Sequence, residues 1–174
     1  LQSRRSSEEA VKVALAEAER RVQAIATVHA ALSQNVDESV DFDEVARTIV
    51  RMAGAIASTD HAVEVITTGS FGTIQADQAQ ALATVLNELV ANSVEHGLAD
   101  RDGHIEVRAE RQGASMTVTV ADDGVGFVPG TPMSGLGTQI VHQMVRGELK
   151  GSIEWAPRQG GGTLVTLHAN LDPA

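Results

Sequence analysis

Residues 86–97 read Leu-Asn-Glu-Leu-Val-Ala-Asn-Ser-Val-Glu-His-Gly. Within this stretch Glu88, Asn92 and His96 are spaced i, i+4 and i+8, so on a helix they share one face. A carboxylate, an amide and an imidazole one turn apart can hold a hydrated Mg²⁺, which prefers oxygen ligands and keeps several waters. An ordinary solvated helix face is the alternative interpretation of the same pattern.

The surrounding sequence predicts the helix that carries this face. Asp77 is a suitable N-cap residue, and Gly97 follows His96 as a stop signal, so we expect a helix from Asp77 to about His96. Its apolar side is predicted to face the core and contains Leu82, Val85, Leu86, Leu89 and Val90.

A second motif follows a predicted strand over 115–121 and reads Asp122-Asp123-Gly124-Val125-Gly126-Phe127. A carboxylate at a strand end can accept a hydrogen bond from an exocyclic amine. The two glycines allow the backbone to turn and to approach a ligand closely. A simple Asp-Gly turn is the alternative.

Two further glycine motifs lie downstream. Ser134-Gly135-Leu136-Gly137-Thr138 opens a predicted helix, and free amides at a helix start form an anion site. The motif lacks the Gly-Lys-[Ser/Thr] ending of a Walker loop and the third glycine of a Rossmann fingerprint. Gly160-Gly161-Gly162-Thr163 precedes the last predicted strand, and a flexible hairpin loop is its alternative interpretation.

The order of the predicted elements favours an α+β fold with one mostly antiparallel sheet over a doubly wound fold. Helical periodicity covers 42–57 and 138–146, on either side of the helix described above. Strands are predicted at 63–67, 104–111, 115–121, 152–156 and 163–169, with a Gly-Ser-Phe-Gly turn after the first.

The N-terminal segment has a different pattern. Residues 6–34 predict one long helix that begins with a capping box at Ser6 and Glu9. We therefore expect residues 1–35 to be a helical segment, 36–41 a linker and 42–174 one domain. Apolar residues along the helix follow a heptad spacing, which requires a partner helix: Val11, Leu15, Ala18, Val22, Ile25, His29 and Leu32.

Composition narrows the classes of function. The chain has 174 residues and a net charge of −10, so broad attraction to nucleic acid or to an anionic membrane is not expected. It has no cysteine, which excludes disulfides and thiolate zinc sites and fits a reducing, cytoplasmic location. No run of about 18 apolar residues is present, so no segment is expected to span or contact a membrane. Because the chain begins at Leu1 without methionine, we expect it to be a fragment of a longer protein, soluble or membrane-tethered.

In their order and spacing, the four motifs resemble the GHKL ATPase superfamily of gyrase, Hsp90, histidine kinases and MutL. Residues 86–97 resemble its N box, and the three glycine motifs resemble its glycine boxes, over about residues 42–170. The resemblance implies a two-layer α/β sandwich of the GHKL (Bergerat) type. Its mixed, mostly antiparallel sheet would be covered by helices on one face and preceded by the long N-terminal helix.

The resemblance also implies ATP and Mg²⁺ as cofactors and gives each matching residue a role. Asn92 would coordinate Mg²⁺ bridging the phosphates, while Glu88 would be the catalytic residue near the γ-phosphate and a second candidate metal ligand. Asp122 would receive the adenine amino group, beside Thr163. The glycine boxes supply the pocket floor, Gly124 and Gly126, and the phosphate-wrapping segment, Gly135, Leu136, Gly137 and Thr138.

Residues 20–32 resemble the second dimerisation helix of PdtaS-like sensor histidine kinases, which are related to the HWE group. In that family the phosphoacceptor histidine lies upstream on the first helix, so it would lie outside this chain. We interpret His29 as a packed core residue. Only residues 127–133 separate the first two glycine boxes, so the lid would be short.

This resemblance implies transfer of the ATP γ-phosphoryl group to a histidine and then to an aspartate of a response regulator receiver domain. A homodimer is expected for the full-length protein. Three alternatives stay open: an anti-sigma-factor type serine kinase, which lacks the heptad-bearing helix; a degenerate nucleotide-binding module without phosphotransfer; and a pure dimerisation protein, which needs no glycine boxes.

Overall fold

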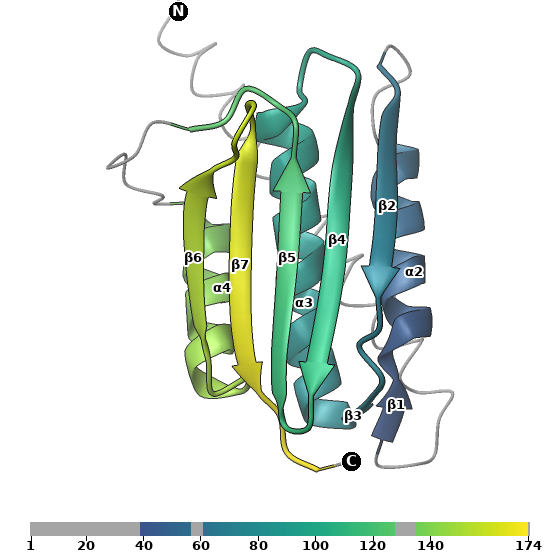
Figure 1. The fold of residues 1–174 in the computed structure, drawn as a ribbon, viewed down its shortest axis with the longest axis vertical. Coiled ribbons are helices and arrows are strands. Elements are labelled where there is room, and N and C mark those ends of the chain that lie inside the picture. Colours follow the sequence, from purple (N-terminus) through teal and green to yellow (C-terminus); the bar gives the residue numbers. More distant parts are fainter. Residues whose placement is uncertain (1–38, 57–60, 128–134, 174) are drawn as a thin grey trace, which may run out of the picture.

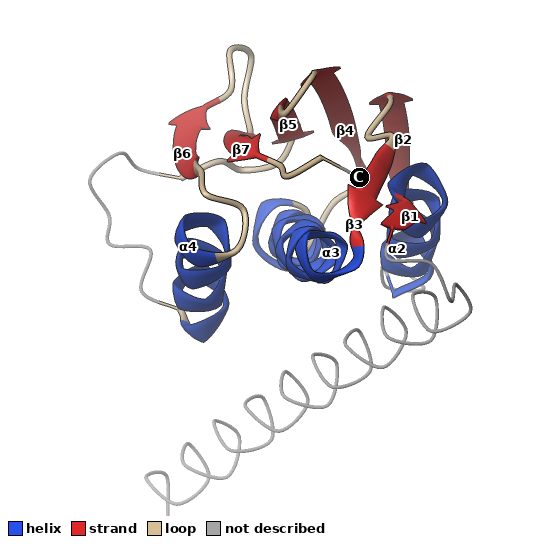
Figure 2. Cartoon of the chain, turned by 90° about the horizontal axis from the view of Figure 1, so that it is seen from below, coloured by secondary structure: helices blue, strands red, loops and turns tan. Residues whose placement is uncertain are grey.

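The computed structural model describes residues 39–56, 61–127 and 135–173. These residues form two layers, with a five-stranded sheet on one side and helices packed on one of its faces (Figures 1 and 2). The α+β class and the one-sided helix layer are therefore confirmed. The elements are β1 (Ser39–Asp41), α2 (Phe42–Ile56), β2 (Val63–Gly69), β3 (Thr73–Gln75), α3 (Ala76–Asn92), the π-helical turn η1 (Ser93–Gly97), β4 (Gly103–Gln112), β5 (Ser115–Asp122), α4 (Leu136–Gly147), β6 (Ser152–Pro157) and β7 (Thr163–Asn170).

The main sheet has the strand order β2-β4-β5-β7-β6. β2 and β4 are parallel, and every other neighbouring pair is antiparallel, as the sequence predicted for most of the sheet. Parallel strands need a long crossover connection, and here it contains α3. This crossover places α3 under the middle of the sheet, between α2 and α4 (Figure 2).

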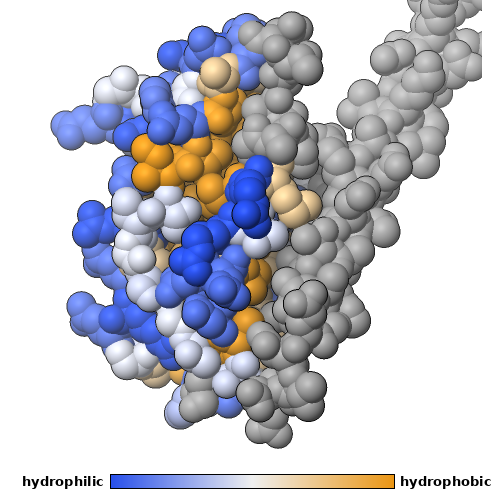
Figure 3. Space-filling view, turned by 90° about the vertical axis from the view of Figure 1, so that its right-hand side faces the viewer, coloured by the Kyte–Doolittle hydropathy of each residue, from blue (hydrophilic) through white to orange (hydrophobic). Residues whose placement is uncertain are grey.

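One face of the sheet is apolar and the other is polar. Along β4, Ile105, Val107 and Ala109 are buried toward the helices, and the residues between them are exposed. This alternation is typical of an antiparallel sheet with one solvated face. On the side of the molecule that carries β2 and α2, hydrophilic residues predominate and apolar residues show between them (Figure 3).

Helix α3 forms the centre of the hydrophobic core. All five residues of its predicted apolar side are buried, with 2% exposure or less. The helix packs against both α2 and α4. In the described part of the chain no helix has the length and hydropathy needed to cross a membrane.

Both ends of α3 differ from the prediction. Its N-cap is Gln75, because β3 leads straight into the helix, and Asp77 instead lies in the first turn, where it accepts a hydrogen bond from the Gln78 N–H at 2.7 Å. The α-helical part ends at Asn92 and continues as η1 to Gly97. Gly97 does end the helical segment, but not in the left-handed backbone typical of a glycine stop.

The other predicted helices and strands are confirmed to within a few residues at each end. Two short strands were missed: β1 lies in the predicted linker and pairs with β3 in a separate two-stranded sheet. Three residues are too few to show a period, so the sequence carried little signal for either. The predicted helix over 6–34, its capping box, its heptad residues and the first part of the linker, 36–38, lie outside the described residues.

Leu86 tests the position of α3 in the core. It is 1% exposed, so Leu86→Ala should lower the free energy of unfolding by about 2–5 kcal/mol, as expected when a buried leucine leaves a cavity. Chemical denaturation measures this, with Gln80→Ala, exposed on the same helix, as the matched control. Equal effects of the two substitutions would contradict the burial of this face.

Candidate functional site

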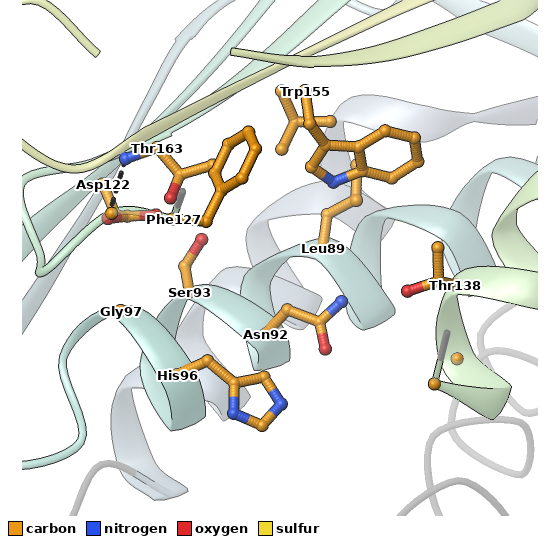
Figure 4. A pocket seen from close by; sticks show the side chains of 14 residues that line it. Leu89, Asn92, Ser93, His96, Gly97, Asp122, Phe127, Thr138, Trp155 and Thr163 are labelled. Carbon is orange, nitrogen blue, oxygen red and sulfur yellow. Dashed lines mark hydrogen bonds between the residues drawn. The ribbon is translucent and has the colours of Figure 1, made fainter. Parts of the chain in front are cut away.

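A pocket of about 250 Å³ lies where the C-terminal end of α3, η1, the start of α4 and the ends of β5, β6 and β7 meet. Its walls come from segments far apart in the sequence, so only the folded chain brings them together (Figure 4). The lining residues are Leu89, Asn92, Ser93, His96, Gly97, Asp122, Gly126, Phe127, Gly135, Gly137, Thr138, Trp155, Thr163 and Val165.

Asp122 is the buried carboxylate of the pocket. It ends β5 and is 2% exposed. Its Oδ1 atom accepts hydrogen bonds from the backbone N–H of Gly124 at 2.9 Å and of Thr163 at 3.2 Å. These donors fix the carboxylate in place, and both use the same oxygen. Oδ2 is left as the acceptor for a ligand, since no described residue donates to it.

The backbone around Asp122 is packed too closely for side chains. A Cβ on Gly97 would lie 3.0 Å from Asp122 Oδ1, and one on Gly124 would lie 2.2 Å from the Gly97 carbonyl oxygen. Gly162 has a φ of +93°, and a Cβ there would lie 2.0 Å from the Asp122 carbonyl oxygen. The N–H of Val125 donates to the Gly97 carbonyl at 3.0 Å. Gly124 therefore lies behind the pocket, where it joins η1 to the end of β5.

The neighbouring Asp123 points to a different set of partners. Its Oδ1 accepts the backbone N–H of His104 at 2.8 Å, and its Oδ2 lies 3.1 Å from Nδ1 of the same residue. The His104 backbone N–H holds the pKa of the Asp123 carboxyl below its ordinary value. The Nε2 atom of His104 also lies 3.4 Å from the Oε2 atom of Glu64. The two carboxylates therefore have different surroundings: Asp122 lines the pocket, and Asp123 contacts the exposed His104 of β4.

The helical face predicted at residues 88–96 only partly reaches the pocket. Asn92 and His96 both line it (Figure 4). Glu88 is 7% exposed and is not among the described lining residues. The described residues contain no group of three His, Cys, Asp or Glu that would hold a metal ion. A metal here would depend on ligand oxygens as well as on the protein, which is how Mg²⁺ is usually bound.

The start of α4 forms the opposite end of the pocket. Gly135 is the N-cap, with extended backbone, and Leu136 is the first helical residue. The side chain of Thr138 is buried, and Gly137 lies beside it in the lining. The first N–H groups of a helix have no partner inside the helix, and the helix dipole is positive there. This end of the pocket therefore favours an anion.

An apolar wall completes the pocket, and the sequence did not predict it. Leu89, Phe127, Trp155 and Val165 form this wall. Trp155 packs against His142 of α4, with ring centroids 5.1 Å apart. The available signal was the alternation along β6, which places Trp155 on the same face as Ile153.

Seven residues assigned to the nucleotide line this one pocket: Asn92, Asp122, Gly126, Gly135, Gly137, Thr138 and Thr163. Gly124 packs behind it, Glu88 lies one turn before Asn92, and Leu136 starts α4. The roles given to these residues stay predictions. Leu89, Ser93, Phe127, Trp155 and Val165 were missed as site residues, and Gly97 was predicted only as a stop signal.

Comparison with known proteins is consistent with this geometry. Residues 77–173 match the family described as "Histidine kinase-, DNA gyrase B-, and HSP90-like ATPase", and residues 1–56 match a histidine kinase family. The sensor histidine kinase PdtaS of Mycobacterium tuberculosis is 40% identical over 172 residues, which cover 96% of this chain and 34% of the relative. The chain thus spans about a third of the length of such relatives.

Two solved structures share the fold. The histidine kinase domain of the Erythrobacter litoralis EL346 blue-light activated histidine kinase aligns with a TM-score of 0.69 and 23% identity, over 88% of this chain and 74% of that one. Full-length ShkA, solved in complex with AMPPNP, aligns with a TM-score of 0.63 and 21% identity, over 88% of this chain and 35% of that one. At this identity they support the fold alone.

The lowered pKa of Asp123 predicts a dependence of stability on pH. The pKa of this carboxyl is lower in the folded chain than in the unfolded chain, where it is about 3.9. The stabilisation that the ionised carboxylate provides is therefore present above about pH 4 and is lost as the pH falls through the folded-state pKa. Asp123→Asn should therefore destabilise the chain at pH 7, and the difference from wild type should shrink by pH 3. Denaturation at pH 7, 5 and 3 measures this, with the exposed Asp100→Asn as control. A difference that stays constant with pH would contradict the role given to Asp123.

Proposed function

This chain belongs to the histidine kinase-, DNA gyrase B- and HSP90-like ATPase family, and we propose that it is the ATP-binding catalytic part of a two-component sensor histidine kinase. The observation that carries the proposal is the buried Asp122 carboxylate facing the α4 N-terminus across one pocket. The first group suits a base with an exocyclic amine, and the second suits phosphate. The histidine kinase match at residues 1–56 supports this function over a serine kinase.

The adenine base is proposed to bind at the Asp122 end. Oδ2 would accept a hydrogen bond from the adenine amino group, while the Gly124 and Thr163 N–H groups hold Oδ1. A buried acceptor discriminates between bases, because a base that presents no donor leaves the carboxylate unpaired. Phe127 lies beside this position (Figure 4), and Gly126 lines the same pocket, so both would cover the base.

The phosphates are proposed to lie between Asn92 and the start of α4. The free N–H groups near Gly137 and Thr138 would donate to phosphate oxygens. The Asn92 amide oxygen would hold Mg²⁺ together with those oxygens and water. When bound, Mg²⁺ neutralises the charge that develops on the transferred phosphoryl group.

The reaction is proposed to be phosphoryl transfer to a histidine. A ring nitrogen of the acceptor attacks the γ-phosphorus, an N–P bond forms, and the bond to the bridging oxygen of ADP breaks. Such transfer depends mainly on positioning and charge neutralisation. Glu88, one turn from Asn92, would accept a hydrogen bond from the other ring nitrogen and so make the attacking nitrogen more nucleophilic.

The rest of the pathway is also proposed here. The phosphoryl group would pass to an aspartate of a response regulator receiver domain, and the intact protein would act as a homodimer. A cytoplasmic location is proposed because ATP is available there. The acceptor histidine is placed upstream of residue 1, and His29 is given no catalytic role.

Nucleotide binding is the first test. Mg-ADP should bind saturably to the chain, and both Asn92→Ala and Asp122→Asn should weaken binding by about 10-fold or more, because each removes a polar contact to the ligand. Calorimetric titration measures the affinity. Asn87→Ala, on the same helix but outside the pocket lining, is the matched control. No binding by the wild-type chain at millimolar nucleotide would sink the proposal.

Phosphotransfer is the second test. In a longer polypeptide that includes the upstream helix, Glu88→Gln should reduce autophosphorylation by about 10²-fold or more while Mg-ATP still binds. Labelled ATP measures the transfer, and an acid-labile product identifies phosphohistidine. His29→Asn should keep the label. Acid-stable label would favour the serine kinase, and full activity of Glu88→Gln would remove its catalytic role.

A further inference from the structure

Trp155 occupies a position in the pocket that none of the four motifs covers. It lies on β6, directly opposite Val165 of β7, and both residues line the pocket. On its other side the ring packs against His142 of α4, with an interplanar angle of 58°. Two elements of the described structure thus hold the indole in place, so its orientation is set before any ligand binds.

The indole N–H of Trp155 is a hydrogen-bond donor, and no described residue accepts a hydrogen bond from it. Among the described residues no fully buried side-chain nitrogen or oxygen lacks a partner, so this nitrogen must contact open space. In Figure 4 the nitrogen lies on the edge of the ring that faces Leu89 and the interior of the pocket. A bound ligand that covers this nitrogen would have to offer it an acceptor, because a buried tryptophan N–H usually finds one.

The position along the pocket indicates which part of a ligand it meets. Asp122 and Thr163 lie at one end, and Thr138 lies at the other, with Trp155 between them (Figure 4). If the base is bound at the first end and the terminal phosphates at the second, the group between them is the ribose and the α-phosphate. An N–H donor binds an anionic oxygen more strongly than a neutral one.

We propose that Trp155 is a nucleotide-positioning residue whose indole N–H donates a hydrogen bond to an α-phosphate oxygen. This rests on the nucleotide-binding function proposed above and adds a ligand contact outside the glycine boxes and the N box. The ring also supplies apolar surface next to the acceptor, which strengthens the hydrogen bond by excluding water.

The chain itself provides a direct probe. Trp155 is its single tryptophan, and the chain has no tyrosine, so its intrinsic fluorescence reports on this position alone. Titration of Mg-ADP into the wild-type chain should change the emission with the same affinity that calorimetry gives. Nucleotide binding in calorimetry without any change in emission would overturn the proposal and leave the nucleotide site standing.

Trp155→Phe separates the N–H from the ring, because it keeps an aromatic side chain against His142. The variant should bind Mg-ADP and AMP about 10-fold more weakly than wild type, by the same factor for both. Its affinity for adenosine, measured by competition against Mg-ADP, should be unchanged. Ile66→Ala, which removes an exposed apolar side chain on β2, is the control and should bind normally.

These measurements distinguish failure of the Trp155 contact from failure of the nucleotide site. Unchanged ADP affinity in Trp155→Phe, or an equal loss for adenosine, would overturn the contact with the α-phosphate. Weaker Mg-ADP binding in Asn92→Ala together with normal binding in Trp155→Phe would support the proposed nucleotide site and reject this inference. No binding by the wild-type chain would reject both.

Discussion

The carboxylate of Asp122 and the backbone at Gly97 meet where the sheet and the helix layer join, and the pocket depends on this contact. A Cβ at Gly97 would lie 3.0 Å from Asp122 Oδ1, tighter than an ordinary contact, and one at Gly124 would overlap the Gly97 carbonyl. The Val125 N–H then links the two segments through that carbonyl. This backbone hydrogen bond ties the end of β5 to η1. The buried Asp122 carboxylate therefore has a fixed position relative to Asn92, which lies about one helical turn before Gly97. The π-helical turn contributes to this geometry, and such turns occur frequently at functional sites.

The sequence predicted most of the fold because its main elements are long enough to show a period. Helix α3 has an apolar side of five residues, and β4 alternates over its whole length. The failures have local causes. β1 and β3 are three residues each, and their pairing depends on segments separated by more than 30 residues. Asp77 looked like an N-cap by residue type, but the strand that precedes the helix fixes the cap at Gln75. The N-terminal helix and its heptad residues lie outside the described part and stay predictions.

The site was predictable to the extent that its residues are unusual in type or spacing. An aspartate directly after an apolar strand, and glycines before a helix, mark the polar ends of the pocket. The apolar wall has no such mark, because Leu89, Trp155 and Val165 look like core residues in any strand or helix. Gly97 shows a related difficulty. Its sequence position indicated a helix stop, whereas in the structure its lack of a side chain makes room for Asp122. Close packing between distant segments is a tertiary property, and a single sequence does not display it.

The net negative charge of the chain means that the pocket can attract phosphate only through short-range contacts. The chain carries a net charge of −10, which repels a nucleotide before it arrives. At physiological ionic strength this repulsion is screened beyond about 8 Å, so it affects encounter more than the bound state. No lysine or arginine occurs among the described lining residues, and His96 is the basic side chain there. In the proposed binding mode, the attraction for phosphate would come from the helix N-terminus, from Mg²⁺ held with the help of Asn92 and from neutral N–H donors. Each of these interactions acts over a few ångströms and depends on direction. Affinity in this pocket therefore requires that the donors and acceptors be held in place. The packing of Trp155 against His142 and of Gly97 against Asp122 holds them there.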